Sequence, residues 1–167
     1  DLPTEEVEIE TPIETCKTPM IAGKKMAIVP ILRAGLGMVG GILALVPSAK
    51  VGHIGLYRDP ETHEPHEYYC KLPDPIEERT IVVTDPMLAT GSSMELSYQA
   101  MLTKGHPAEI HVASIIASRQ AVEHIAETLP EDKTTIWCAA IDPEINEHSY
   151  IVPGLGDAGD LAFGEKE

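Results

Sequence analysis

The 167-residue chain is poor in aromatic side chains and in positive charge. Aromatic residues make up only 4% of it, so the core has to be built from aliphatic side chains. Lys and Arg number 12 against 27 Asp and Glu, a formal charge of −15. This balance excludes generic binding to nucleic acid or to an anionic membrane, because both need basic patches. No apolar run approaches the roughly 18 residues that a membrane span requires.

Several motifs of common enzyme and metal-binding classes are missing as well. Cys16, Cys70 and Cys138 lie far apart and form no C-x-x-C pair, which is typical of a reducing compartment such as the cytoplasm and predicts no structural zinc site. The seven histidines include no H-E-x-x-H motif, so we expect no dedicated metal centre. The P-loop pattern G-x-x-x-x-G-K-[ST] and the nucleophile elbow G-x-S-x-G are also absent.

The apolar pattern predicts an α/β fold. The length fits one domain over residues 1–167, and a hydrophobic content of 43% suits a packed core. Short apolar runs alternate with helical spacing, which is typical of a mainly parallel sheet flanked by helices. We expect strands over residues 26–32, 51–57, 80–84, 110–117 and 134–141, and helices over residues 36–46, 92–104 and 119–129.

Three segments lie outside this alternation. Residues 1–23 are acidic and interrupted by prolines, and the alternation Val7-Glu8-Ile9-Glu10 predicts an edge strand or hairpin there. Residues 58–75, rich in Pro, His and Glu, predict a long exposed loop or arm. Residues 142–167 are dense in Gly and Pro and predict loop. Ligands bind at the carboxyl ends of parallel strands, so the segments that leave the strands are the candidate sites.

The first candidate is the segment after strand 80–84, which opens a helix. Its small residues allow backbone N–H groups to close around an anion, and the helix N-terminus adds partial positive charge. This predicts a phosphate cradle, whereas an ordinary strand-to-helix turn with a Ser or Thr N-cap is the alternative. The segment consists of Asp85, Pro86, Met87, Leu88, Ala89, Thr90, Gly91, Ser92 and Ser93.

The second candidate is the segment ILRAGLGMVG, residues 31–40. It contains G-x-G-x-x-G, and Asp59 follows 19 positions after Gly40, which is close to the dinucleotide-binding fingerprint. However, Arg33 stands where the chain should turn tightly, and Pro30 interrupts the strand. The alternative is therefore a tight turn that presents the guanidinium fork of Arg33 to an anion.

Two further segments carry weaker signals. Arg58 ends the strand 51–57, where it suits a second phosphate, although a surface pair with Asp59 or Glu61 explains it as simply. Residues 150–160 hold four glycines around Asp157, so the backbone can approach a flat ligand closely. An ordinary glycine-rich loop is the alternative for this last segment.

Together these segments resemble the signature blocks of the uracil phosphoribosyltransferase family. The matching blocks, in the family's order and at similar spacing, are VPILRAGLGM, GLYRD, TDPMLATGSS and NEHSYIVPGLGDAGD. The resemblance runs from about Lys24 to Gly164 and implies a type I phosphoribosyltransferase fold, with an extended arm and a small C-terminal hood, residues 142–167. It also implies a further N-terminal segment ahead of residue 1 that serves subunit contacts, and hence a homo-oligomer, either dimer or tetramer.

The resemblance implies an activity in pyrimidine salvage. Uracil and 5-phosphoribosyl 1-pyrophosphate (PRPP) would give UMP and pyrophosphate, with Mg²⁺ entering mainly through the substrate's pyrophosphate, and GTP activates some relatives. Arg33, Asp85 and Asp157 would be catalytic, and uracil would be held by Ile151, Gly156, Asp157 and Ala158. The residues that the resemblance assigns to PRPP are Arg33, Arg58, Asp85, Pro86, Met87, Leu88, Ala89, Thr90, Gly91, Ser92, Ser93 and Asp157.

These implied roles are more specific than the local patterns. Asp85 would hold the ribose hydroxyls, residues 89–93 would cradle the 5′-phosphate, and Arg33 and Arg58 would bind the pyrophosphate. The arm, with Tyr68 and Tyr69, would cover the site and exclude water.

The chain departs from the family's usual pattern at the phosphate-binding segment. Ser92 replaces a glycine, so we expect it to fit only with a negative φ, and Thr84 stands where Val is common. Two alternative functions remain open at this point. A non-catalytic regulator that binds RNA would need a basic face, which the net charge opposes. An NAD-binding oxidoreductase would leave the other three blocks unexplained.

Overall fold

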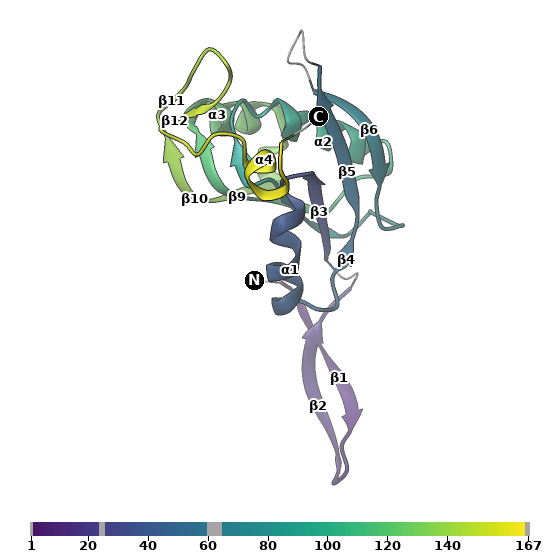
Figure 1. Ribbon diagram of the computed structural model, residues 1–167. Coiled ribbons are helices and arrows are strands. Elements are labelled where there is room, and N and C mark those ends of the chain that lie inside the picture. Colours follow the sequence, from purple (N-terminus) through teal and green to yellow (C-terminus); the bar gives the residue numbers. More distant parts are fainter. Residues whose placement is uncertain (1, 24–25, 60–64, 166–167) are drawn as a thin grey trace.

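The computed structural model describes residues 2–23, 26–59 and 65–165. It shows a central sheet with helices on both sides and a two-stranded hairpin that extends away from the body (Figure 1). The strands of the central sheet are β3 (Ala27–Leu32), β4 (Lys50–Val51), β5 (His53–Arg58), β6 (Pro65–Lys71), β7 (Thr80–Thr84), β8 (Met87–Leu88), β9 (Glu109–Ser118) and β10 (Thr134–Asp142). The helices are α1 (Leu36–Leu45), α2 (Ser92–Leu102), α3 (Arg119–Thr128) and α4 (Ala158–Phe163), with a 3₁₀ turn at Glu131–Lys133.

The strand order places the predicted binding segments at one edge of the sheet. The order is β10-β9-β7-β3-β5-β6, with β4 beside β3 and β8 beside β9. Within the described chain every pair in this sheet is parallel except β5 and β6. Because β3, β5 and β7 run in the same direction, the segments that follow them emerge together. The predicted mainly parallel α/β fold is confirmed.

The central strands are buried on both faces. In β3 the residues Ala27 to Ile31 are all buried, and in β7 Ile81 and Val83 are fully buried. Parallel strands covered by helices on both sides carry continuous apolar runs rather than alternating ones, which is the pattern of the strands predicted here. In Figure 1 the helices α2 and α3 lie behind the sheet, whereas α1 and α4 lie in front of it.

The helices begin where the sequence places good start signals. Ser118 caps α3: its hydroxyl accepts the Ala121 N–H at 2.9 Å, and Ala121 and Ile125 face the core. Helix α2 begins after Gly91, whose φ is +85°. The three predicted helices are confirmed to within two residues at each end.

The predicted loop over residues 58–75 is wrong in part, because residues Pro65–Lys71 form β6. This strand pairs antiparallel with β5, with Gly55 opposite Tyr69, and a register shift between Gly55 and Leu56 bends it. Polar and proline residues suggested a loop, but the backbone pairing with β5 stabilises an edge strand there. Residues 60–64 of the arm lie outside the described residues.

The predicted loop over the hood is also wrong in part. Residues Glu144–Ile145 (β11) and Ile151–Val152 (β12) pair antiparallel, and α4 follows them. Asp157 explains the helix, because its Oδ1 accepts the N–H of Asp160 at 2.9 Å and so caps a segment that is otherwise rich in glycine. The predicted strand 51–57 begins two residues late as β5, since Gly52 separates it from β4.

The acidic lead forms the hairpin that the alternation predicted. Strand β1 (Thr4–Glu10) pairs antiparallel with β2 (Thr15–Ile21), and the Thr11 hydroxyl closes the turn by donating to the Glu14 carbonyl at 2.8 Å. Among the residues that the structure describes, none belongs to a helix long and apolar enough to cross a membrane.

Truncation of a central side chain should measure how tightly this core is packed. Ile81 is fully buried in β7, so Ile81→Ala should lower the free energy of unfolding by about 2–5 kcal/mol through lost burial and a residual cavity. Glu123→Ala, at an exposed position of α3, should change it by less than about 0.5 kcal/mol. Urea denaturation measures both, and equal effects would contradict the assignment of β7 to the core.

Candidate active site

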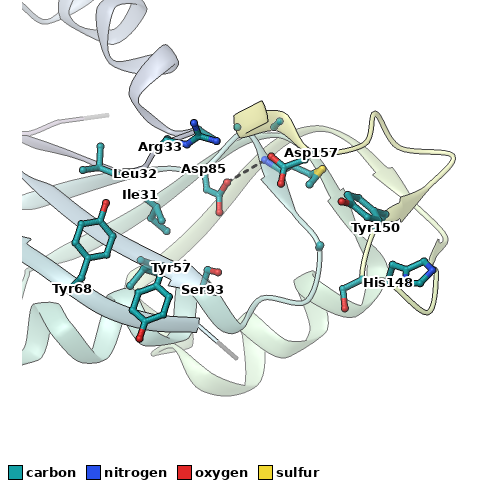
Figure 2. A pocket seen from close by; sticks show the side chains of 17 residues that line it. Ile31, Leu32, Arg33, Tyr57, Tyr68, Asp85, Ser93, His148, Tyr150 and Asp157 are labelled. Carbon is teal, nitrogen blue, oxygen red and sulfur yellow. Dashed lines mark hydrogen bonds between the residues drawn. The ribbon is translucent and has the colours of Figure 1, made fainter. Parts of the chain in front are cut away.

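A cavity of about 680 Å³ lies at the carboxyl edge of the central strands. Its walls come from four places: the turn after β3, the β5–β6 pair, the segment after β7, and the hood (Figure 2). Arg33, Asp85 and Asp157 lie close together on one side of the cavity. Tyr57 and Tyr68 lie on another wall, apart from Tyr150 of the hood. The segments that the sequence singled out therefore meet around one space.

Asp85 occupies the end of β7 at the wall of the cavity. Its Oδ1 accepts the N–H of Met87 at 3.3 Å, which restrains the carboxylate at the cavity (Figure 2). Its own N–H donates to the Ala113 carbonyl of β9 at 3.2 Å. The carboxylate thus stands on backbone that the sheet holds in place.

The segment predicted to cradle a phosphate, residues 89–93 and called the phosphate loop below, leads from this wall into α2. Ala89 and Ser93 line the cavity, so the first turn of the helix faces it. Gly91 takes the left-handed backbone conformation at φ +85°. Within the described residues, Glu78 and Ser149 are the non-glycine residues with positive φ, so Ser92 meets the expectation of a negative φ. The Thr90 and Ser92 hydroxyls bond each other at 2.7 Å.

Arg33 follows β3 and reaches across to the hood. Its Nη2 donates to Asp160 Oδ1 at 2.7 Å, and its Nη1 donates to the Gly164 carbonyl at 3.3 Å. Its Nε is buried and has no hydrogen-bond partner within the described part of the chain. The side chains of Arg33 and Asp160 are 36% and 31% exposed, so water screens this ion pair in part.

The glycines of the G-x-G-x-x-G motif do not behave as a dinucleotide fingerprint. A Cβ at Gly35 would collide with the Thr84 carbonyl, so Gly35 serves the packing of β3 against β7. A Cβ at Gly37 or Gly40 would meet nothing within 4 Å. In the fingerprint the third glycine allows close helix–strand packing, and Gly40 makes no such close contact here. The motif is therefore a turn that presents Arg33.

Thr84, the second departure from the family's usual residues, is fully buried at the end of β7. Its hydroxyl donates to the Gly35 carbonyl at 2.9 Å, which satisfies the buried group and ties the end of β7 to the start of α1. The bond links the turn that carries Arg33 to the strand that carries Asp85.

The hood is shaped by local hydrogen bonds. Asn146 Oδ1 accepts the N–H groups of His148 and Tyr150 at 3.0 and 2.9 Å, which closes the β11–β12 hairpin. Gly154, at φ +56°, donates its N–H to Asp142 Oδ2 at 3.0 Å. These contacts direct Tyr150, Asp157 and the start of α4 toward the cavity.

The β5–β6 pair contributes an aromatic wall. Tyr57 and Tyr68 line the cavity with their rings 6.5 Å apart. A Cβ at Gly55 would lie 2.5 Å from Tyr68 Cζ, so this glycine allows the ring to lie on β5. Tyr69, which was expected beside Tyr68 in the cover, is outside the lining and 44% exposed.

The structure brings together some, but not all, of the residues singled out in the sequence. Those that line the cavity are Arg33, Asp85, Met87, Ala89, Ser93, Asp157 and Ala158. Those that lie behind or beside it are Pro86, Leu88, Thr90, Gly91, Ser92, Ile151 and Gly156. Ile151 is 3% exposed and anchors the hood, whereas Gly156 is exposed. The side chain of Arg58, at the end of β5, is outside the described part.

Sequence reasoning missed Asp160, Tyr57, His148 and Tyr150. Asp160 follows Asp157 by three residues, the spacing at which a helix-capping side chain meets a backbone N–H, and this signal could have revealed α4.

Cys70 on β6 is outside the cavity lining; burial raises the pKa of its thiol, with Glu67 adding to the rise and Lys104 opposing it. A raised pKa keeps the thiol protonated and unreactive.

The backbone matches solved phosphoribosyltransferases. A purine phosphoribosyltransferase from Pyrococcus horikoshii superposes with a TM-score of 0.52 at 15% identity, over 74% of this chain and 81% of that chain, which shows the fold alone. A protein from Aquifex aeolicus matches with a TM-score of 0.90 at 36% identity, over 98% of this chain and 77% of that chain. The fold is that of the type I phosphoribosyltransferases.

The sequence defines the family within that fold class. The family model described as uracil phosphoribosyltransferase matches residues 1–165. A uracil phosphoribosyltransferase from Thermoanaerobacter sp. (strain X514) is 55% identical over 166 residues, which are 99% of this chain and 78% of the relative. The chain belongs to the uracil phosphoribosyltransferase family. The resemblance inferred from the four sequence blocks is thereby confirmed.

Alanine substitutions at Gly91 and at Gly37 should have opposite effects on stability, because the two glycines have different structural roles. Gly91→Ala should destabilise the fold by at least about 1 kcal/mol, because alanine is strained at φ +85° and its Cβ would lie 2.9 Å from His124 Cδ2. Gly37→Ala should stabilise by about 0.5–1 kcal/mol, since Gly37 is helical and its surroundings are open. Thermal unfolding checks both, and a destabilising Gly37→Ala would contradict this account of the motif.

Proposed function

We propose that this protein transfers the 5-phosphoribosyl group of PRPP to uracil, forming UMP and pyrophosphate. The observation that carries the proposal is one cavity lined by a helix N-terminus, two carboxylates, a guanidinium-bearing turn and a hood with accessible backbone. Each of these suits one part of the two substrates. Membership of the uracil phosphoribosyltransferase family supports the same assignment.

The phosphate loop binds the 5′-phosphate of PRPP. Backbone N–H groups in the first turn of a helix have no partner within the helix, and the helix dipole adds about half a positive charge there. Ser93 lines the cavity at this turn, and the Thr90–Ser92 hydroxyl pair lies beside it. A dianion is held at this position without any lysine, which agrees with the acidic composition of the chain.

Asp85 and Asp157 serve the ribose. Cleavage of the bond between C1 and pyrophosphate builds positive charge on the sugar, as in glycoside chemistry. Two carboxylates on fixed backbone stabilise this charge more in the transition state than in the bound substrate, which accelerates the reaction. Asp85 also accepts hydrogen bonds from the ribose hydroxyls, because ionised carboxylates accept but do not donate.

Arg33 and Arg58 stabilise the departing pyrophosphate. The guanidinium of Arg33 carries five N–H donors. In this structure its two terminal nitrogens donate to Asp160 and to the Gly164 carbonyl. Pyrophosphate carries more charge than one carboxylate, so it competes with Asp160 for this guanidinium. Binding of PRPP is then coupled to the position of α4.

A divalent metal fits the donors present. Asp85 and Asp157 offer oxygen atoms at the cavity, and the described residues contain no cluster of three or more His, Cys, Asp or Glu that could hold a metal by itself. These donors suit Mg²⁺, because it usually binds through one or two carboxylates together with substrate phosphates. When bound, Mg²⁺ would neutralise charge that develops on the leaving pyrophosphate.

The hood recognises uracil through its backbone. Ile151, Gly156 and Ala158 belong to the β12–α4 segment, of which Asp157 and Ala158 line the cavity. Cytosine would leave buried groups of such a site unpaired. Tyr57 and Tyr68 on the opposite wall exclude water from the reactive sugar, in the role expected of the arm.

We also infer a homo-oligomer in the cytoplasm. Helix α1 is apolar, yet Leu36 and Leu45 are 42% and 84% exposed, and the β1–β2 hairpin extends away from the body (Figure 1). Apolar faces of this kind are typical of subunit interfaces. Free thiols at Cys16, Cys70 and Cys138 support a reducing compartment. The proposal includes activation by GTP, which is supported by the family resemblance alone.

A pyrophosphate-release assay tests the function. Purified protein with PRPP and Mg²⁺ should form UMP from uracil, and the rate with cytosine should be lower by about 10⁴-fold, because cytosine cannot pair with groups arranged for uracil. Product identity is checked by chromatography against UMP. A folded protein that forms no UMP would overturn the proposal, and equal rates with both bases would overturn the assigned recognition.

Removal of Arg33 should cost activity while leaving the fold intact. Arg33→Ala should lower kcat/KM for PRPP by about 10²–10³-fold, through lost stabilisation of the leaving group. Its effect on the free energy of unfolding should stay within about 1 kcal/mol, since the Arg33–Asp160 pair is one-third exposed. Arg119→Ala, on the exposed first turn of α3, is the matched control and should leave kinetics unchanged.

A further inference from the structure

Helix α3 holds the phosphate loop from the side opposite the cavity. At one end of the loop, the buried Ser118 hydroxyl donates to the Ala89 carbonyl at 2.5 Å. In the middle of the loop, the His124 side chain packs against Gly91, where an added Cβ would lie 2.9 Å from Cδ2 of the ring. The loop is thus restrained at two points, its first residue and its middle, by one helix.

His124 also bonds the helix that the loop opens. Its Nε2 lies 2.9 Å from Glu95 Oε2 on α2, and both side chains are 34% exposed. The backbone N–H of Glu95 donates to the Gly91 carbonyl at 3.0 Å. Gly91, Glu95 and His124 therefore form a closed set of three contacts: a backbone bond, a side-chain bond and a packing contact.

The partners of this pair limit its freedom further. Glu95 Oε1 accepts from Gln99 Nε2 at 3.2 Å, one turn later on α2, and the His124 carbonyl accepts from the Thr128 hydroxyl at 2.7 Å. The carboxylate is thereby held by one bond within its own helix and one bond to α3. Gly91 lies at φ +85° beside the His124 ring, which leaves no room for a side chain there.

We propose that His124 and Glu95 are positioning residues for the 5′-phosphate of PRPP, acting through Gly91. The inference rests on the proposed function. Neither residue lines the cavity, so neither touches the substrate. The backbone N–H groups of Ser92 and Ser93 follow directly after Gly91, and their direction depends on its conformation. Small displacements of such groups weaken substrate binding and orientation strongly.

The kinetic constants should separate positioning from general stability. His124→Ala should raise KM for PRPP about tenfold, with kcat and KM for uracil within about twofold of wild type, because only phosphate binding is loosened. His124→Gln, which keeps an N–H donor toward Glu95, should restore most of the affinity. Glu123→Ala, at the exposed position before His124, is the matched control and should change nothing.

The two residues should act as one unit. Glu95→Ala leaves the ring on Gly91 but removes its partner, so it tests the proposal even if His124→Ala unfolds. The double variant Glu95→Ala/His124→Ala should bind PRPP with an affinity no lower than that of the weaker-binding single variant. Both single substitutions break the same bond, so their effects should not add. Calorimetric titration with ribose 5-phosphate, which has the 5′-phosphate but no pyrophosphate, should show the same loss of affinity in both single variants.

The outcomes distinguish this inference from the proposed function. Wild type that binds ribose 5-phosphate but forms no UMP would overturn the proposed function alone. Active wild type together with folded variants of unchanged KM and Kd would overturn the positioning role alone. Equal increases in KM for PRPP and for uracil, or additive effects in the double variant, would also overturn it, because they indicate a general loss of structure.

Discussion

The close approach of the β3 and β7 exits is the constraint on which the site depends. Gly35 lies so near the end of β7 that any side chain there would collide with the Thr84 carbonyl, and the Thr84 hydroxyl bonds the Gly35 carbonyl in return. This contact places the turn bearing Arg33 beside the strand end bearing Asp85 (Figure 2). A guanidinium and a carboxylate thus share one wall of the cavity. Parallel pairing of β3 with β7 makes the approach possible.

The distribution of charge explains how an acidic protein accommodates an anionic substrate. The chain carries a formal charge of −15, yet its phosphate loop supplies backbone N–H groups and a helix N-terminus rather than lysines. Arg33 is paired with Asp160, and each side chain is about one-third exposed. The same ion pair connects the turn after β3 to the hood. Positive partial charge at the cavity therefore comes from local geometry and not from net charge.

The support behind the phosphate loop is of a different kind. The loop is a stretch of small residues with few side-chain contacts of its own, so its shape depends on what packs behind it. Helix α3 provides this packing through Ser118, which bonds the Ala89 carbonyl, and through His124, which rests on Gly91. A flexible glycine is useful at this position only because the neighbouring helix restricts it to one conformation. Helix α3 thereby supports the loop at Ala89 and at Gly91.

The sequence by itself determined the alternation of the five main parallel strands with helices α1 to α3, and the family. Continuous apolar runs mark buried parallel strands and helical spacing marks α1 to α3, because both patterns follow from burial of a local segment. The four blocks around Arg33, Arg58, Asp85 and Asp157 identified the family. Tertiary structure alone decided that Asp160 pairs with Arg33 and that residues 65–71 form a strand, since both depend on partners distant in the chain. Spacing along a sequence carries no information about such contacts.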